Sequence, residues 1–489
     1  MTHEPALLGI DLGTQSAKCV VIDAAGKLHG IGQTAYSIQH PQPNWAEQNP
    51  KDWWEAVVQA VRQARTNAPQ PIAGIGLAGQ MHGIVLLDKN LDPLHPAIIW
   101  MDRRSAEISA QIMTNTAPDL LRRSAVNRLS PGFAGASLAW LRENEPELLN
   151  QTHAVIQPKD YLALRLTGVL GSEHSDASAT WLYDIPARDW SEALAEICNV
   201  SPTLLPPLSE STRPIGALQA AAAEALGLEP GIPVVAGAAD QAALLTGAGV
   251  INPGEGAITI GTGGQMTLVS DRPLLDSALR LNTFCHAVPG LWYTMGAILN
   301  GGIALHWWSN VLGGVDFTAL TEAAAQIPPG AEGVIFLPYL AGERTPHMDP
   351  NACGVFYGLT PQHTQAHMTR AVLEGVAFAF LDCLQTLATV GQVPKHWRTG
   401  GGGSRGALWR QVLASVLGVE LQIMEGEEHT ATGAALLAGV GAGVFKDLPQ
   451  AVEQVVRTGP VEVPDMEAHS VYRTLYGRFR ALYWALRNV

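Results

Sequence analysis

Cysteine is scarce in this sequence and never clustered. No two cysteines have the CxxC spacing of a zinc site or a redox-active dithiol, and the five stand alone: Cys19, Cys198, Cys285, Cys353 and Cys383. Isolated cysteines are typical of a reducing compartment, where thiols stay free. We therefore expect neither a disulfide framework nor a cysteine-bound metal.

Positive charge is also in short supply. The chain has 30 Lys and Arg against 44 Asp and Glu, which gives a formal net charge of −14 at pH 7. Binding to nucleic-acid phosphates needs clustered Lys and Arg, so this balance argues against a nucleic-acid partner.

Long hydrophobic runs are missing as well. No uncharged apolar run reaches the length of a transmembrane helix, so we expect no membrane partner. Residues 1–11 lack the basic region of a signal peptide and lead into an expected strand. These observations favour a soluble protein of the cytoplasm.

Two nucleotide-binding motifs are absent or ambiguous. The P-loop pattern GxxxxGK[ST] does not occur. GxGxxG occurs twice, but the copy at 74–79 leads into a turn and a strand, where a dinucleotide fold needs a helix. The copy at 401–406, GGGSRG, opens an expected helix over 407–418, although 394–400 is a poor candidate for a buried strand. Packing against an adenine ring is the favoured interpretation, and NAD binding stays open as the alternative.

What is present is the alternation of short strands and helices typical of an α/β protein. The 489 residues exceed the size of one hydrophobic core, so two domains are expected. Strand-like runs lie at 83–88, 233–240, 256–261 and 333–340.

One helix is well marked over 49–64. Asn49 can cap it, Pro50 suits its first position, and Asp52 favours the positive end of the helix dipole. The face that we expect to be buried carries Trp54, Val57, Val58 and Val61.

An internal echo joins the two halves of the chain. IDLGTQSAKCVVID (10–23) aligns without gaps to ITIGTGGQMTLVSD (258–271), each reading as strand, Gly-Thr turn and strand. Chance similarity of two hairpins is the alternative. Because each copy begins one half of the chain, we expect related domains at 1–250 and 251–489.

The two turns have the composition of phosphate sites. Backbone N–H groups and hydroxyls of GTQS (13–16) and GTGG (261–264) can contact phosphate oxygens without an obstructing Cβ. Asp11, a charge inside an apolar strand, can hold Mg²⁺ through water. Two ordinary hairpin turns remain the alternative for each turn taken alone.

With these motifs in view, the chain resembles the FGGY carbohydrate kinases, and within them the xylulokinases. The resemblance runs through nearly the whole sequence in the stretches GIDLGTQSAK (9–18), NWAEQNPKDWW (44–54), GQMHGIVLLD (79–88), PKDYLALRLTG (158–168), NTFCHAVPG (282–290), GERTPHMDPNACGVFYGLT (342–360) and GGGSRGALWRQVLASVLG (401–418). It implies two actin-like (ribonuclease H-like) domains, each a mixed β-sheet flanked by helices, with a catalytic cleft between them. Sugar would bind the first domain and ATP the second.

The resemblance also implies an activity and partners. The expected reaction is ATP- and Mg²⁺-dependent phosphorylation of D-xylulose to D-xylulose 5-phosphate by a homodimer. Another ketose, a sugar acid or a polyol is the alternative substrate. An actin-like ATPase would keep both Gly-Thr turns, and an NAD-dependent oxidoreductase rests on GGGSRG alone.

Residue roles follow from the matching motif positions. Asp240 would be the general base, ionised because an unperturbed aspartate has a pKa near 3.9, and a second candidate metal contact beside Asp11. The sugar-contacting residues would be Met81, His82, Trp100, Asp102, Asp240 and Gln241. The ATP-contacting residues would be Gly13, Thr14, Gln15, Ser16, Gly261, Thr262, Gly263, Gly302, His306, Gly402 and Gly403.

Structural roles compete with some of these assignments. Asp240 could cap a helix, His82 could be an ordinary core histidine, and Asp102 could pair with Arg104 at the surface. Glu343 and Arg344 are expected to pair or to brace the cleft, without a chemical role.

Four positions depart from the xylulokinase pattern. Met101 and Arg103 replace a usual Asn and Gly, Gln241 replaces a common Asn, and Ser415 replaces a common acid. The sugar is therefore less firmly indicated than the kinase activity.

Overall fold

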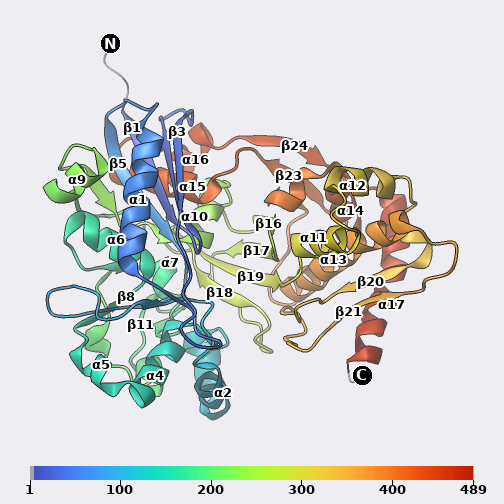
Figure 1. The fold of residues 1–489 in the computed structure, drawn as a ribbon, viewed down its shortest axis with the longest axis horizontal. Coiled ribbons are helices and arrows are strands. Elements are labelled where there is room, and N and C mark those ends of the chain that lie inside the picture. Colours follow the sequence, from blue (N-terminus) through green and yellow to red (C-terminus); the bar gives the residue numbers. More distant parts are fainter. Residues whose placement is uncertain (1–4, 488–489) are drawn as a thin grey trace.

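The structure, a computed structural model, describes residues 5–487. Two lobes lie side by side, and each is built on a seven-stranded mixed sheet (Figure 1). The first sheet has the order β13-β14-β5-β1-β2-β3, with β15 also paired to β5. Its strands are β1 (Ala6–Leu12), β2 (Ser16–Ile22), β3 (Leu28–Ala35), β5 (Ile72–Gly79), β13 (Pro214–Ala217), β14 (Pro233–Val235) and β15 (Ala238–Ala239).

The second sheet repeats this topology. Its order is β18-β19-β17-β16-β22-β23-β24. In both sheets the first hairpin and the strand beside it are antiparallel, the next two neighbours are parallel, and the far edge is antiparallel. The strands are β16 (Gly256–Ile260), β17 (Gly264–Ser270), β18 (Asn282–Cys285), β19 (Trp292–Ile298), β22 (His396–Gly400), β23 (Glu420–Met424) and β24 (Thr458–Glu462). The prediction of two lobes with mixed sheets is confirmed.

The internal echo is therefore a structural repeat, with one difference in length. Four residues separate the last strand pair of the first hairpin, Leu12 and Ala17, whereas three separate Ile260 and Gly264 in the second. When the gapless alignment matches the first strands of the two hairpins, it therefore offsets their second strands by one residue.

Helix α1 (Pro50–Arg65) forms where its capping signals predicted it. Asn49 accepts a hydrogen bond from the Lys51 N–H, and Pro50 begins the helix. The buried face is rotated from the expected one, because Trp53 is fully buried while Trp54 and Val58 are only partly so. The alanines Ala56, Ala60 and Ala64 complete that face and let α1 lie close to the β3 backbone.

Two glycine-bearing helices cross where the lobes meet. Helix α10 (Asp240–Gly247) lies against α15 (His429–Gly441), which also packs on β1 and β5 although it comes late in the sequence. A Cβ on Gly433 would lie 1.9 Å from the Ala243 carbonyl oxygen, and one on Gly247 would lie 1.9 Å from that of His429. Both positions therefore require glycine. The core around this crossing includes residues of both sheets, among them Leu7 and Ala257.

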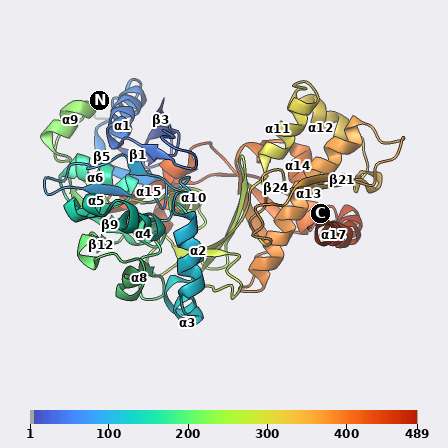
Figure 2. The ribbon, with the colours of Figure 1, turned by 60° about the horizontal axis from the view of Figure 1, so that its bottom comes forward.

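The second lobe is built around α13 (Gln365–Ala388). This helix is long and apolar enough to cross a membrane, but 83% of its apolar window is buried. Packing in the core accounts for its composition. Around it lie α11 (Gly302–Val311), α12 (Phe317–Ala325), α14 (Ala407–Leu417), α17 (Met466–Leu486) and the hairpin β20 (Ile335–Pro338) and β21 (Gly354–Tyr357) (Figure 2).

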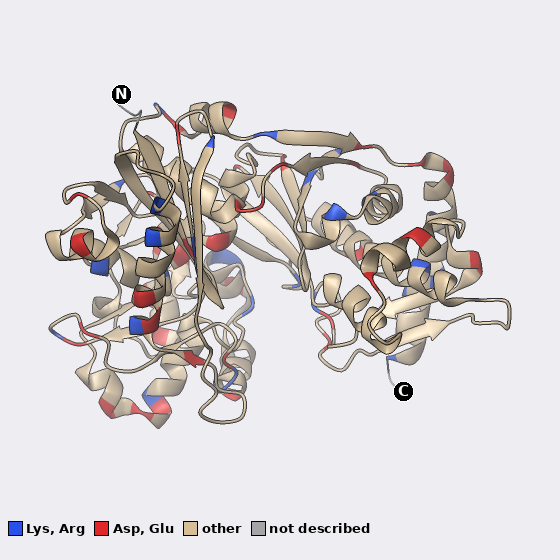
Figure 3. Cartoon of the chain, turned by 45° about the horizontal axis from the view of Figure 1, so that its top comes forward, with Lys and Arg blue, Asp and Glu red and all other residues tan. Residues whose placement is uncertain are grey.

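The remaining elements complete the first lobe and its junction with the second. They are β4 (Glu47–Gln48), β6 (Val85–Leu87), β7 (Ala97–Ile98), β8 (Ala154–Ile156), β9 (Ser172–Glu173), β10 (Tyr183–Asp184), β11 (Asp189–Trp190), β12 (Leu208–Ser209), α2 (Ala106–Asn115), α3 (Pro118–Leu120), α4 (Ala134–Asn144), α5 (Pro146–Gln151), α6 (Pro158–Thr167), α7 (His174–Ala177), α8 (Glu192–Ile197), α9 (Ala220–Leu226) and α16 (Leu448–Val455). Lys and Arg are interspersed with Asp and Glu over both lobes (Figure 3).

One strand expectation was wrong. Residues 396–400, dismissed as a poor buried strand, form β22 between β16 and β23 in the second sheet. Trp397 is fully buried and its Nε1–H is satisfied by the Pro394 carbonyl, 2.9 Å away, so the polar composition is accommodated. Tertiary pairing overrides a weak local preference here.

Candidate active site

A cavity of about 570 Å³ lies between the lobes. Its walls come from both hairpins, from the start of α10 and from the loops at 299, 344, 400 and 424–430. Six of the predicted residues line it: Asp11, Trp100, Gln241, Gly261, Thr262 and Gly263.

The first Gly-Thr turn keeps its carbonyl groups occupied. Tyr36 donates its hydroxyl to Gly13 O and its N–H to Gln15 O, and Gln48 Nε2 donates to Thr14 O at 2.7 Å. Among residues 5–487 no acceptor is found for the N–H groups of Thr14 and Gln15. Thr14 Oγ1 accepts a hydrogen bond from Trp100 Nε1 at 2.9 Å, which ties the turn to the cavity wall.

The second turn is held in the same way. Gly302 N donates to Gly261 O at 2.7 Å, and the N–H groups of Gly301 and Ile303 donate to Thr262 O. No acceptor within the described part of the chain takes the N–H groups of Gly261, Thr262 or Gly263. Both turns therefore offer N–H groups and withhold carbonyls, the arrangement that binds anions.

Asp11 lacks the partner that its buried position calls for. The residue opposite it on β2 is Lys18, but the Lys18 ammonium pairs with Glu428 at 3.1 Å. Asp11 Oδ1 is buried without a hydrogen-bond donor among the described residues. Burial raises the pKa of Asp11 to about 7, and the charge of Asp240 adds to this while Lys18 opposes it.

An unpartnered carboxylate oxygen fits the water shell of a magnesium ion. Among residues 5–487 no group of three or more His, Cys, Asp and Glu side chains could hold a metal directly. Mg²⁺ commonly keeps several waters, and one or two carboxylates together with phosphate oxygens are sufficient to hold it.

Asp240 lies where β15 ends and α10 begins. Ala238 of β15 and Asp11 of β1 both pair with Ala78 of β5, so the register brings the two aspartates to the same sheet edge. Asp240 Oδ1 accepts the Gln241 N–H at 2.6 Å, and no donor among the described residues reaches Oδ2. The strand-end position is therefore confirmed, whereas the N-cap alternative is wrong, because Ala239 is the N-cap and Asp240 is the first residue of α10.

The Asp240 carboxyl is less acidic than expected. Burial raises its pKa to about 6, and the Gln241 N–H partly offsets this effect. The expectation of an unperturbed value near 3.9 is therefore wrong. The residue stays mostly ionised at neutral pH and is a stronger base than a solvated aspartate.

Met81 and His82 do not line this cavity. His82 stacks on Phe133 with ring centres 3.9 Å apart, and its Nδ1 lies 2.7 Å from the Ala179 carbonyl oxygen. A carbonyl only accepts, so Nδ1 carries the proton and Nε2 is left as an acceptor. Burial lowers the pKa of His82 to about 4, so the ring is neutral. Met81 is buried and receives the Tyr293 hydroxyl on its sulfur at 3.8 Å.

Asp102 is fully buried, so the surface ion-pair alternative is wrong. Its oxygens accept from Ala46 N at 2.7 Å, from Arg104 N at 2.9 Å and from the Arg104 guanidinium. Arg104 in turn contacts Glu47 at 2.5 Å. With both oxygens occupied, Asp102 shapes the loop that carries Trp100.

The residues assigned to adenosine are dispersed around the second turn. Gly302 lies beneath the turn, and His306 is exposed one helical turn further along α11, next to Asn310. Gly402 and Gly403 follow β22, but their neighbours Gly400 and Gly401 are the ones that line the cavity. A Cβ on Gly402 would meet nothing within 4 Å, whereas one on Gly403 would meet Ile260.

Two cations on the cavity wall were missed from the sequence. Lys18 is inside the first motif, and the strand register opposite Asp11 could have indicated it. Arg344 lines the cavity, and no acid lies within 4 Å of its guanidinium among the described residues. Glu343 does not pair with it, because Glu343 Oε1 accepts the N–H groups of Leu299 and Arg344.

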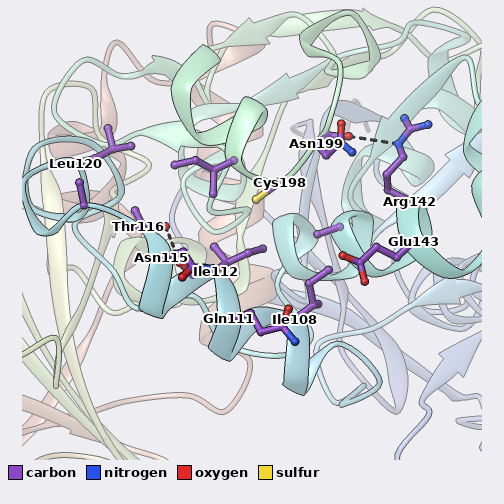
Figure 4. Close-up of a pocket in the computed structure, with 13 residues that line it drawn as sticks. Ile108, Gln111, Ile112, Asn115, Thr116, Leu120, Arg142, Glu143, Cys198 and Asn199 are labelled. Carbon is purple, nitrogen blue, oxygen red and sulfur yellow. Dashed lines mark hydrogen bonds between the residues drawn. The ribbon is translucent and has the colours of Figure 1, made fainter.

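A second cavity, of about 430 Å³, lies elsewhere in the first lobe. Residues of α2, α4 and the end of α8 line it, including Ile112, Arg142 and Cys198 (Figure 4). It contains none of the predicted site residues.

Comparisons with known proteins agree with this architecture. The model of the FGGY family of carbohydrate kinases, N-terminal domain, matches residues 6–247, and that of the C-terminal domain matches residues 256–442. The chain is 37% identical to the xylulose kinase of Escherichia coli (strain K12) over 98% of this chain and 99% of that one. It is 30% identical to the gluconokinase of Bacillus subtilis (strain 168) over 99% and 96%. The crystal structure of a "xyloylose kinase" from Brucella ovis superposes with a TM-score of 0.93 at 35% identity, covering 99% of both chains.

These matches account for both lobes, for the repeated hairpins and for the cavity between them. Because carbohydrate-kinase domains match both halves of the chain, the alternatives of a dinucleotide-binding oxidoreductase and of an actin-like ATPase without a sugar site are not supported. The chain belongs to the FGGY family of carbohydrate kinases, and it has the actin-like pair of domains of that family.

Proposed function

We propose that this enzyme transfers the γ-phosphoryl group of ATP to D-xylulose, giving D-xylulose 5-phosphate and ADP. The observation that carries the proposal is the pair of Gly-Thr turns, whose N–H groups have no acceptor among the described residues. The turns lie beside a cavity lined by Asp11 and by Gln241, the residue next to Asp240. Xylulose kinases aligned over nearly the full length support the choice of sugar.

The step that we assign to Asp240 is proton removal. The terminal hydroxyl oxygen of the sugar attacks the γ-phosphorus, the bond from that phosphorus to the β-bridging oxygen breaks, and ADP leaves. The hydroxyl proton passes to Asp240, whose Oδ2 has no donor among the described residues. Proton loss late in a loose transition state asks for a modest base, and the gain is roughly 10²–10⁴-fold.

The remaining residues bind and orient. We assign the two turns, together with Lys18 and Arg344, to the phosphate charge, and His82 Nε2 to a sugar hydroxyl. Asp11 would hold waters of a magnesium ion, which would neutralise charge on the β- and γ-phosphates. We assign residues 1–250 to sugar binding and residues 251–489 to ATP, and we expect a cytoplasmic homodimer.

Gluconate is the substrate with the best-supported competing claim. The gluconokinase of Bacillus subtilis aligns over 99% of this chain, and Arg344 could pair with a carboxylate. A coupled ADP-release assay over pentuloses, aldonates and polyols tests the proposal. The highest kcat/KM should be with D-xylulose, and a tenfold preference for an aldonate would overturn the choice of sugar while leaving the kinase activity intact.

A further inference from the structure

A buried charge cluster lies behind Asp240. Lys159, at the start of α6, is fully buried, and its Nζ lies 2.6 Å from Asp160 Oδ1 and 3.8 Å from Glu173 Oε1 and Asp176 Oδ2. Its remaining contact is with the backbone, at 3.1 Å from the Ala236 carbonyl oxygen. Burial by itself lowers the pKa of Lys159, but the three carboxylates raise it overall, so the residue is a cation.

Glu173 organises the other side of the cluster. Its two oxygens accept from Ser175 N at 2.7 Å, Ser175 Oγ at 2.9 Å, Asp176 N at 2.8 Å and Ser211 Oγ at 3.1 Å. Four donors on one buried carboxylate leave Ser175 with a single orientation. In that orientation Ser175 Oγ accepts the Ala239 N–H at 2.9 Å.

The cluster therefore holds both ends of the four-residue segment before Asp240. Lys159 holds the Ala236 carbonyl, and Ser175 holds the Ala239 N–H. Strand β15 itself is only two residues long and pairs on one side with β5, so its own ladder fixes it weakly. Asp240 is the next residue in the chain.

We infer that the relay Lys159–Glu173–Ser175 positions the Asp240 carboxylate for proton removal. This inference rests on the proposed function, in which Asp240 is the base. None of these three residues lines the cavity, and they act through the backbone of residues 236–239. The sequence segments PKD (158–160) and SEHSD (172–176) therefore share one role, which is to position Asp240.

Ser175→Ala tests the relay because it removes one hydroxyl and leaves every charge in place. Misplacement of a catalytic group by about 1 Å costs up to about 10²-fold in rate. We expect kcat to fall about 10–100-fold, with the KM for ATP changed less than about twofold. Hydrogen exchange of the Ala239 amide should quicken, since this N–H loses its acceptor.

Ser172→Ala is the matched control. Like Ser175, Ser172 is buried, and it precedes α7, the helix that contains Ser175. The Ser172 hydroxyl, however, has no hydrogen-bond partner among the described residues. It should keep wild-type kcat. Equal loss of kcat in both variants, or unchanged kcat in Ser175→Ala, would overturn the inference.

Glu173→Gln provides a second measurement if Ser175→Ala folds poorly, and it too should lower kcat more than KM. Asp240→Asn separates the two proposals. If Asp240→Asn is inactive while Ser175→Ala keeps full turnover, the positioning role fails and the base assignment stands. If Asp240→Asn keeps full turnover, the base assignment fails, and the positioning role that rests on it fails as well.

Discussion

At the scale of single residues, the site depends on two aspartates in different surroundings. Asp240 has one satisfied oxygen, while Asp11 has a buried oxygen without a donor among the described residues. Burial raises the pKa of both carboxyls, to about 6 for Asp240 and to about 7 for Asp11. The first is suited to accept a proton and the second to attract a hydrated cation.

Removing the base should abolish turnover without emptying the nucleotide site. Asp240→Asn is expected to lower kcat at least about 10²-fold, because only proton acceptance is lost. Binding of a non-hydrolysable ATP analogue, followed by calorimetry, should change less than about threefold. Wild-type turnover would contradict the assignment.

The pH profile of the wild-type enzyme should show the raised pKa of Asp240. A base works only when deprotonated, so kcat/KM should fall as pH drops through about 6. An unperturbed aspartate would instead keep the enzyme active to about pH 4. Initial rates from pH 5 to 8 distinguish the two.

Asp11→Asn should stabilise the protein while it impairs catalysis. The folded pKa of about 7 exceeds the unfolded value, so ionising Asp11 destabilises the fold progressively from about pH 4 to pH 7. The variant avoids this cost, so the free energy of unfolding at pH 7.5 should rise by about 1–3 kcal/mol after discounting for solvent. The gain should vanish near pH 4. Denaturant unfolding at both pH values measures it, and destabilisation at pH 7.5 would contradict it.

At the scale of elements, local sequence signals determine where a helix begins, whereas tertiary packing determines which of its faces is buried. Asn49 and Pro50 specified the start of α1 from the sequence alone, because a cap acts within one helical turn. The buried face was misjudged, since the small residues Ala60 and Ala64 take their place only through the nearby glycines of β3. Likewise β22 forms through its two strand neighbours and not through its own composition.

The crossing of α10 and α15 should tolerate no side chain. Gly433→Ala places a Cβ 1.9 Å from the Ala243 carbonyl oxygen, so we expect a loss of about 1–3 kcal/mol in the free energy of unfolding. Gly477→Ala is the matched control, because the added Cβ on α17 meets nothing within 4 Å. That variant should be neutral or stabilised by up to about 1 kcal/mol. Thermal unfolding of both tests the crossing.

At the scale of the whole molecule, the repeated sheets bring two weak motifs to one cavity. Each Gly-Thr turn alone is an ordinary hairpin turn. Their shared topology sets them at corresponding edges of two sheets, and the α10–α15 crossing joins the lobes (Figure 2). A ligand held by both turns would therefore stabilise both lobes.

A single methyl on the second turn should separate nucleotide binding from folding. A Cβ on Gly261 has no neighbour closer than 3.9 Å, so Gly261→Ala should fold normally. Gly261 itself lines the cavity, so we expect the added methyl to hinder the approach of a phosphate group. A saturating ATP analogue with Mg²⁺, at about 100 times Kd, should stabilise the wild type by about 2.7 kcal/mol and the variant far less.

Gly402→Ala is the companion variant, because a Cβ there also meets nothing within 4 Å. If Gly402 contacts adenosine as the family resemblance implies, this variant should also lose nucleotide stabilisation. Full stabilisation of Gly261→Ala would contradict a phosphate role for the second turn.

The sequence by itself determined the hairpins, the helix caps, the position of Asp240 after an apolar strand and the family motifs in their order. These features depend on residues that are close together in the chain or on the identity of motif residues. Only the tertiary structure decided which turn carbonyls accept hydrogen bonds and that Lys18 and Arg344 line the cavity. It also decided that Asp102 is buried with both oxygens hydrogen-bonded. Likewise, it placed Lys159 and Ser175 in hydrogen bonds to the segment before Asp240. Those properties depend on partners far apart in the sequence, because desolvation and hydrogen-bond satisfaction are set by everything that surrounds a group after folding.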